Sequence, residues 1–135
     1  MDGIIDLVCE LKKKCIESDS QFSSTLNITD SEYNFMKALI NCNNLNSKSI
    51  SKKMGLSLSR VSRIIDKLVK NGYLLRYNDE IDRRTININL TKEGENLKNV
   101  TIKFIANCEK RITDNLSEEE LNNLKKYLSS IIDIL

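Results

Sequence analysis

The sequence contains no proline, no histidine and no tryptophan, and it has only four glycines among its 135 residues. A chain with so few helix breakers favours long helices over an architecture of many strands. Because histidine is absent, neither a Ser-His-Asp nor a Cys-His arrangement for nucleophilic catalysis can form. The sequence also lacks the GxGxxG and GxxxxGK[ST] loops that hold phosphate groups. We therefore expect a helical protein that is not an enzyme.

Metal sites and membrane spans are also poorly supported by the sequence. The four cysteines show no CxxC spacing, and without histidine the usual zinc ligand sets are missing, so we expect no metal and no cofactor. No apolar run approaches the roughly 18 residues that span a bilayer, and the start Met1-Asp2-Gly3 lacks the basic residues of a signal peptide. A soluble, cytoplasmic protein with a single domain over 1–135 is the expectation.

Positive charge is concentrated in the middle of the chain. Residues 47–92 contain eleven Lys and Arg but four acids, a net charge of +7, whereas the remaining 89 residues carry −5. A nucleic-acid-binding protein needs its attraction for phosphate on one face, and a local basic segment provides this. The charge pattern therefore indicates a nucleic-acid-binding segment that the overall charge of +2 conceals.

Apolar spacing and capping residues predict six helices and one β-hairpin. The pairs Thr29–Glu32 and Ser117–Glu120 have the spacing of capping boxes, and Gly55 stands where a left-handed helix cap belongs. The Ser-rich stretch 19–28 is expected to be a loop. Predicted helices cover 4–18, 29–40, 47–54, 57–71, 91–112 and 117–135, and predicted strands cover 73–77 and 85–90.

The middle of this order predicts a winged helix-turn-helix in a mainly α fold with a small β-hairpin wing. The turn at Gly55 is too short for the flanking helices to lie parallel. The second of them, 57–71, has an apolar side formed by Leu58, Val61, Ile64, Ile65, Leu68 and Val69, and a polar, basic side. The charged loop 78–84 then projects from the hairpin as a wing.

The basic side of helix 57–71 and the hairpin loop are the candidate DNA contacts. Arg60 and Arg63 have the length to reach guanine O6 and N7 in the major groove or phosphate oxygens, and the hairpin tip Asp82-Arg83-Arg84 offers guanidinium groups to a narrow minor groove. Lysines and a serine of the preceding helix are candidates for phosphate contacts that set the register. The predicted DNA-binding residues are Ser47, Lys48, Lys52, Lys53, Ser57, Ser59, Arg60, Ser62, Arg63, Lys67, Asp82, Arg83 and Arg84.

Three stretches in this region resemble the wing and exit of MarR-type transcriptional regulators. They are Gly72-Tyr73-Leu74-Leu75-Arg76, Asp82-Arg83-Arg84 and Ile88-Asn89-Leu90-Thr91-Lys92-Glu93-Gly94, and the resemblance covers about residues 28–98. It implies that Arg84 enters the minor groove with Asp82 bracing it, and that Arg63 contacts DNA from the recognition helix. It further implies a repressor that binds a pseudo-palindromic duplex and is released by a small aromatic or lipophilic effector.

The same resemblance implies a homodimer built by the first helix and the last two helices. The expected division is a DNA-binding lobe at 28–92 and a helical dimerisation region at 1–20 and 92–135. Long apolar stripes on these terminal helices favour self-association, and two-fold DNA readers need half-sites about 34 Å apart. The alternative is that the stripes form an ordinary intramolecular helical core.

Two other functions remain open. A winged helix can serve as a protein–protein interaction module that never binds DNA. Alternatively, cysteines can make such a regulator a redox sensor, for which Cys9 and Cys15 are the candidates; only Cys15, after three lysines, has the cationic neighbourhood of a reactive thiol. Buried or incidental thiols are the simpler interpretation.

Overall fold

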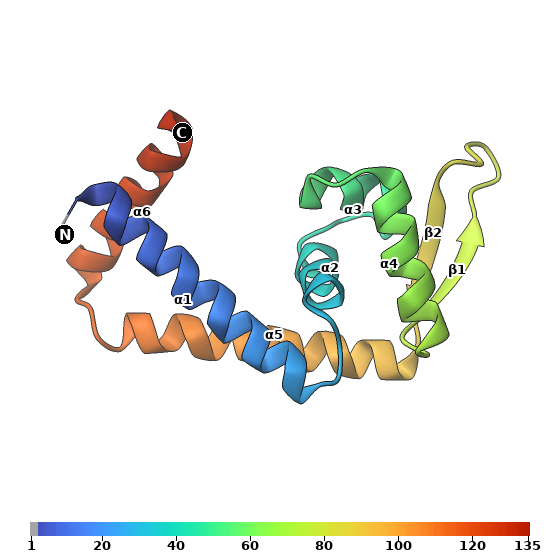
Figure 1. Ribbon diagram of the computed structural model, residues 1–135, viewed down its shortest axis with the longest axis horizontal. Coiled ribbons are helices and arrows are strands. Elements are labelled where there is room, and N and C mark those ends of the chain that lie inside the picture. Colours follow the sequence, from blue (N-terminus) through green and yellow to red (C-terminus); the bar gives the residue numbers. More distant parts are fainter. Residues whose placement is uncertain (1–2) are drawn as a thin grey trace. The chain divides into compact units, whose positions relative to one another are not determined.

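Six helices and one β-hairpin make up residues 3–135, the part of the chain that this computed structural model describes (Figure 1). The predicted mainly α fold with a β-hairpin wing is confirmed. Met1 and Asp2, which the predictions for 1–20 and for the N-terminus include, lie outside the described residues. The elements are α1 (Ile4–Thr25), α2 (Asp30–Ile40), α3 (Ser47–Met54), α4 (Leu58–Lys70), β1 (Leu74–Asn78), β2 (Ile86–Leu90), α5 (Lys92–Thr113) and α6 (Glu118–Ile134).

Helix α1 is longer than the sequence predicted. The expected loop over 19–28 is wrong for most of its length, because α1 continues to Thr25. Serine usually weakens helices, since its hydroxyl competes for backbone hydrogen bonds. Here the buried Ser23 uses its hydroxyl in a tertiary contact and donates to Oδ1 of Asp30 at 2.7 Å. This contact ties the last turn of α1 to the start of α2 and offsets the weak helix propensity.

The predicted helix caps are confirmed. The backbone N–H of Glu32 donates to Thr29 Oγ1 at 3.1 Å, and the Glu32 carboxylate accepts from the Thr29 N–H at 3.0 Å. Ser117 and Glu120 make the same reciprocal pair at the start of α6. Gly55 ends α3 with φ 67°, a left-handed conformation that is costly for residues with a Cβ. Each cap satisfies backbone groups that a helix end leaves without partners.

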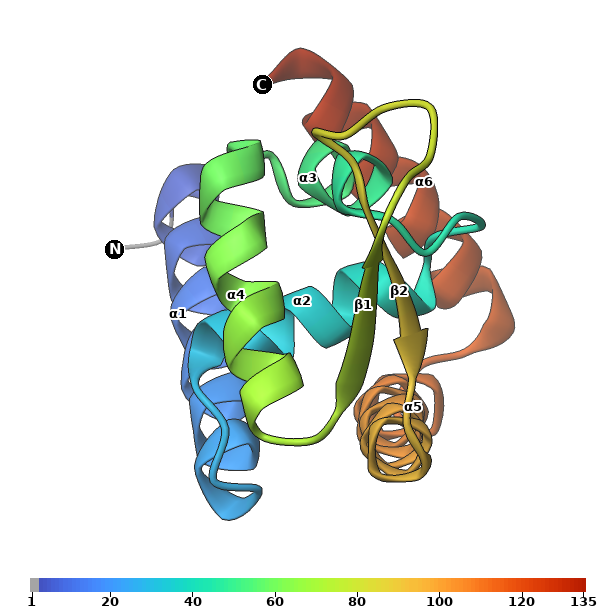
Figure 2. The same ribbon diagram turned by 90° about the vertical axis from the view of Figure 1, so that its right-hand side faces the viewer.

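The core of the first compact unit, Met1–Thr101, lies among α2, α3, α4 and the hairpin. Figure 2 shows α4 beside the hairpin with α2 and α3 behind them. Leu58 was predicted on the apolar side of α4, but it is 38% exposed because it starts the helix beyond the reach of this core. The largest apolar side chains of the core are Tyr33, Phe35, Met36, Leu39, Ile50, Val61, Ile65, Leu68, Leu74 and Ile88.

A single residue, Thr91, separates the hairpin from α5. Its hydroxyl donates to the Gly72 carbonyl at 2.5 Å, and its N–H donates to the Tyr73 carbonyl at 3.1 Å. The first turn of α5 packs so closely here that a Cβ at Gly94 would lie 2.0 Å from the Tyr73 carbonyl oxygen. Glycine at this position therefore lets α5 begin directly against the root of the wing.

The second compact unit, Ile102–Leu135, contains the end of α5 and all of α6. None of its residues is buried. Apolar side chains are also exposed along α1 in the first unit. The two units divide inside α5, and the predicted single domain with a lobe at 28–92 remains a prediction. The exposed apolar residues of α1 and of the second unit are Ile4, Ile5, Leu7, Leu11, Ile16, Ile102, Ile112, Tyr127, Leu128, Ile132, Ile134 and Leu135.

Residues 3–135 contain neither a membrane-spanning helix nor a metal-binding cluster. No helix in this range combines the length and the apolar character that crossing a bilayer requires. No group of three or more metal-ligating side chains comes together there either.

Candidate nucleic-acid interface

Helix α4 is held by the core along one side and capped at its start. Val61, Ile65 and Leu68 on this side are fully buried. Ser57 is the N-cap, and its hydroxyl accepts the Arg60 backbone N–H at 3.2 Å. The cap and the buried side fix the rotation of α4, so its opposite side presents a constant set of polar groups.

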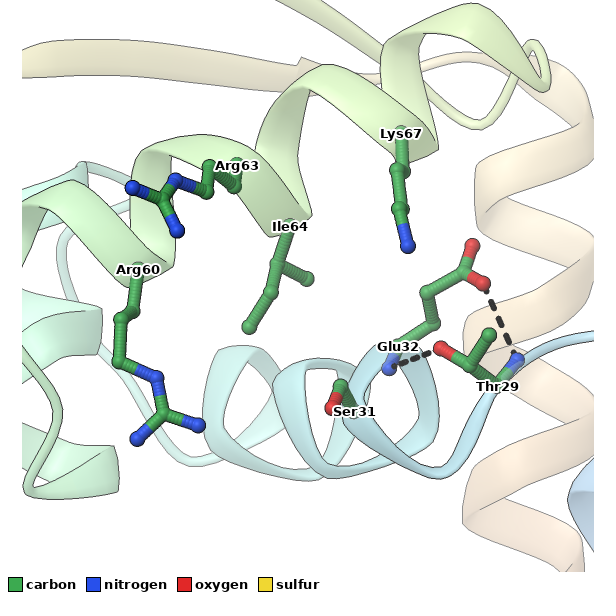
Figure 3. Close-up of a pocket in the computed structure, with 7 residues that line it drawn as sticks. All are labelled: Thr29, Ser31, Glu32, Arg60, Arg63, Ile64 and Lys67. Atoms are coloured by element: carbon green, nitrogen blue, oxygen red, sulfur yellow. Dashed lines mark hydrogen bonds between the residues drawn. The ribbon is translucent and has the colours of Figure 1, made fainter.

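Three cations of α4 line one pocket, as Figure 3 shows. Arg60, Arg63 and Lys67 follow at helical spacing and face a space of about 300 Å³ between α2 and α4. Thr29, Ser31, Glu32 and Ile64 complete the lining. Within residues 3–135, ion pairs form at Lys37–Asp19, Arg76–Asp66 and Lys110–Asp114 only, so these three cations have no acidic partner there.

The hairpin is attached to α4 by an ion pair as well as by packing. Strands β1 and β2 are antiparallel, with Leu74 opposite Leu90 and Asn78 opposite Ile86. Arg76 of β1 pairs with Asp66 of α4. Leu74 and its inward-facing neighbours on β2 complete the apolar contact with the core. The wing and α4 therefore keep a fixed relation within this unit.

Asp79 organises the wing loop. One oxygen of its carboxylate, Oδ1, accepts the backbone N–H groups of Ile81 at 2.9 Å and Asp82 at 3.1 Å. The other oxygen, Oδ2, accepts from Asn87 Nδ2 at 3.3 Å. The hydrogen bonds from Ile81 and then Asp82, followed by the one from Asn87, lower the pKa of Asp79 below its ordinary value because they stabilise the ionised carboxylate.

Asp82 braces the backbone of the loop. Its Oδ1 accepts the Arg84 backbone N–H at 3.0 Å, and its Oδ2 accepts the Thr85 hydroxyl at 3.2 Å. The side chains of Arg83 and Arg84 are exposed and have no ion-pair partner among the described residues. Asp82 therefore sets where Arg84 leaves the loop, while the Arg84 guanidinium is free to meet another molecule.

The wing loop and the first turn of α4 lie at the same end of the unit in both views (Figures 1 and 2). In α3, Lys48, Lys52 and Lys53 are exposed. Ser59 on α4 is exposed as well, and Ser62 is half-buried. These side chains and the exposed arginines add positive and hydrogen-bonding groups to one compact unit.

The side chain of Ser47 serves the fold instead of the surface. Ser47 is 1% exposed, and its hydroxyl accepts the Ile86 backbone N–H at 2.9 Å. A phosphate cannot reach a hydroxyl that is buried and already joins α3 to β2. The structure therefore does not support the predicted phosphate contact of the Ser47 side chain.

Sequence reasoning missed part of the chemistry of Glu32. The capping-box signal identified one oxygen of its carboxylate, but Glu32 is only 3% exposed and its second oxygen, Oε2, is buried without a hydrogen-bond partner. Local spacing carried no signal for this burial, since it arises where α2 packs against α4.

The role of Asp79 was also missed, although the sequence contains a signal for it. An Asp in a turn commonly accepts the backbone N–H groups of the residues that follow it.

Comparison with known proteins gives one family. Residues 28–86 match the MarR family. The chain is also similar to the HTH-type transcriptional regulator SarZ of Staphylococcus aureus, with 25% identity over 125 residues that cover 90% of this chain and 83% of SarZ. The similarity to SarZ thus extends well beyond the segment that matches the family.

Solved structures share the fold. Streptococcus pneumoniae FabT, determined in complex with DNA, has a TM-score of 0.83 and 21% identity, covering 97% of this chain and 94% of FabT. The S. aureus MepR–DNA complex has a TM-score of 0.82 and 21% identity, covering 98% of each chain. The likeness confirms the winged-helix fold with its flanking helices.

Proposed function

We propose that the chain, whose residues 28–86 match the MarR family, is a regulator of that type that binds specific double-stranded DNA and acts on transcription as a repressor. The observation that carries this proposal is the clustering of unpaired cations in one compact unit. Arg60, Arg63 and Lys67 lie along the exposed side of α4, and Arg83 and Arg84 lie on the wing loop beside it. SarZ is a transcriptional regulator, and FabT and MepR were each determined with DNA, which supports the same role here.

Each element has a distinct role in the proposed complex. Helix α4 enters the major groove, where Arg60 and Arg63 address guanine O6 and N7, because an α-helix fits that groove and guanidinium groups match that acceptor pair. Arg84, accompanied by Arg83, enters the minor groove, where a narrow groove concentrates negative potential. Lys48, Lys52, Lys53, Ser57, Ser59, Ser62 and Lys67 contribute phosphate or short polar contacts, and Asp82 positions the loop.

A titration over a salt series tests this proposal. Duplex fragments are selected from the host genome by binding to the protein, and their affinity is measured by fluorescence anisotropy. We expect log affinity to fall steeply with log salt, and the Arg84→Ala variant to show a shallower slope, because each phosphate neutralised by the protein releases counterions. A flat dependence for the parent protein would contradict DNA binding.

The protein is proposed to act as a homodimer on a pseudo-palindromic operator. Apolar residues exposed on α1 and throughout the second unit support this, since that unit buries no side chain of its own. A two-fold arrangement would present one α4 to each of two half-sites about 34 Å apart. Sedimentation equilibrium should return twice the chain mass of 15.5 kDa, and a monomer at micromolar concentration would contradict this assembly.

Repression is proposed to end when a small aromatic or lipophilic effector binds, as is typical of this family. A cytoplasmic protein that is not an enzyme is part of this proposal, because its relatives named above are regulators of transcription. Screening such compounds for release of the bound duplex tests this part. If oxidants release the duplex instead, and Cys9→Ser or Cys15→Ser abolishes that release, the redox alternative holds; both thiols are exposed.

The rival protein–protein module makes the opposite prediction at low salt. A gel-shift assay with random genomic duplex separates the two functions, because the cations described above should retard any duplex when screening is weak. Absence of retardation would favour the interaction module.

A further inference from the structure

The strongest unexplained feature of the described residues is the carboxylate of Glu32. Its oxygen Oε1 accepts the Thr29 N–H, whereas Oε2 is buried and has no hydrogen-bond partner. Buried polar atoms are normally hydrogen-bonded, and an ionised carboxylate loses more hydration on burial than a neutral group. Oε2 therefore lacks a donor, and a cation in the pocket that Glu32 lines between α2 and α4 can supply one.

Lys67 is the cation placed to supply it. In Figure 3 the Lys67 ammonium and the Glu32 carboxylate point into the same end of the pocket, whereas Arg60 and Arg63 occupy the other end beyond Ile64. Arg60 precedes Lys67 by about two helical turns, or roughly 10 Å along the axis. Lys67 has a flexible side chain of four methylene groups and no acidic partner within residues 3–135, so its ammonium is free to turn toward Glu32.

We propose that Glu32 is a positioning residue that holds Lys67 against α2 in the DNA-free protein and withholds it from phosphate. This inference rests on the proposed DNA-binding function. Its physical basis is competition, because one ammonium group cannot neutralise a buried carboxylate and a DNA phosphate fully at the same time. While Lys67 stays on Glu32 it makes no phosphate contact in the complex, which lowers the affinity for DNA and makes that affinity less sensitive to salt than the number of lysines and arginines suggests.

The Glu32→Gln variant isolates the charge. Gln keeps the shape of the side chain and still accepts the Thr29 N–H, because capping boxes use Glu or Gln at this position. We expect this variant to bind the selected duplex more tightly at low salt. The slope of log affinity against log salt should steepen by about 0.9, the contribution of one added phosphate contact, which means about 3.5-fold more loss of affinity between 50 and 200 mM salt.

Glu80→Gln is the matched control. It removes the same charge from the exposed wing loop, where no hydrogen bond or ion pair holds Glu80 among the described residues. A general loss of negative charge would raise affinity in both variants alike. The proposal requires Glu32→Gln to have the larger effect on the slope.

A double-mutant cycle identifies the partner. In a Lys67→Gln background, the Glu32→Gln change should leave the salt slope and the affinity unaltered, because the ammonium it would release is no longer present. If Glu32→Gln has the same effect with and without Lys67, Glu32 acts on DNA binding in another way. If Glu32→Gln has no effect in the parent background, the pair does not form. Either result overturns the proposal.

Stability measurements test the contact without DNA. Lys67→Gln should lower the denaturant midpoint of unfolding more than Lys70→Gln, since Lys70 is exposed on the same helix and does not line the pocket. The Glu32→Gln change should cancel this difference. Equal midpoints for the two lysine variants would contradict the contact. Because this arm needs no nucleic acid, it separates failure of the Lys67–Glu32 contact from failure of the proposed function.

Discussion

The two cationic parts of the candidate interface are held in place by different forces. Helix α4 carries Arg60 and Arg63 on a rigid element whose opposite side is buried in the core. The wing loop carries Arg83 and Arg84 on a segment with little apolar burial, fixed by the carboxylates of Asp79 and Asp82. Solvent exclusion therefore orders one part, and exposed hydrogen bonds order the other.

This difference determines how each part responds to change. Hydrophobic burial involves no titrating group and no charge that salt screens, so α4 should present the same side chains when the pH or the ionic strength changes. Hydrogen bonds to a carboxylate depend on its ionisation, so the wing should loosen in acid while α4 does not.

Removing core contacts beneath α4 should have the largest effect. Ile65 is 0% exposed, and Ile65→Ala should lower the free energy of unfolding by about 2–5 kcal/mol, because a cavity remains where the side chain was. Ile81 at the wing tip is 97% exposed, so Ile81→Ala should change stability by less than about 0.5 kcal/mol. Chemical denaturation of both variants measures the contrast, and similar losses would remove it.

Removing Arg63 from α4 should have the second-largest effect. Arg63→Ala should weaken binding of the selected duplex by about 1–3 kcal/mol and relax the base preference at one position, because a guanidinium contact to guanine is lost. Lys48→Ala is the control, since a phosphate contact lacks base preference and its loss should weaken all duplexes alike. Competition binding with single-base variants of the operator measures the preference. An unchanged preference in Arg63→Ala would assign it to phosphate.

Arg84 on the wing loop should contribute less to DNA affinity than Arg63. Arg84→Ala should reduce the salt slope by about 0.9, equivalent to one phosphate contact, and should weaken binding more to A·T-rich spacers than to G·C-rich ones. Minor-groove readers favour the narrow groove of A-tracts, which explains the expected spacer dependence. Anisotropy titrations on two operators that differ only in the spacer test this. Equal losses on both would place Arg84 outside the minor groove.

Acid should loosen the wing and leave α4 unchanged. The pKa of Asp79 is lowered from its ordinary value of 3.8 by hydrogen bonds from Ile81, Asp82 and Asn87. The ionised carboxylate therefore stabilises the wing loop fully above pH 3.8. This stabilisation is lost as the pH falls through the lowered pKa that Asp79 has in the folded protein, because protonation weakens these hydrogen bonds. Faster amide exchange at Ile81 and Asp82 should then appear below pH 4, with no change in the α4 amides. Asp79→Asn should show the loosened loop at neutral pH.

Local signals predicted much of the fold. Thr29–Glu32 and Ser117–Glu120 marked the starts of α2 and α6, because a capping box is complete within four residues. Gly55 marked the turn before α4, since its left-handed conformation is a property of one residue. Features that depend on a few neighbouring residues were therefore accessible from the sequence.

Features that depend on distant contacts were not accessible. The end of α1 was misplaced because the helical state of 19–25 is supported by Ser23 bonding to Asp30 of α2. Ser47 was assigned to the surface, although its hydroxyl holds a backbone group of β2 that is 39 residues away. Glu32 was recognised as a cap, but its buried Oε2 depends on how α2 packs against α4. In each case a tertiary partner decides the role, and spacing along the chain does not reveal it.

The junction at Thr91 has a mechanical consequence for the wing. With one residue between β2 and α5, and with Gly94 seated against the Tyr73 carbonyl, the chain has no slack at that point. A tilt of the first turn of α5 is therefore transmitted to the base of the hairpin, where a small rotation becomes a larger displacement at the tip. A ligand that moves this turn therefore displaces Arg84 without contacting it.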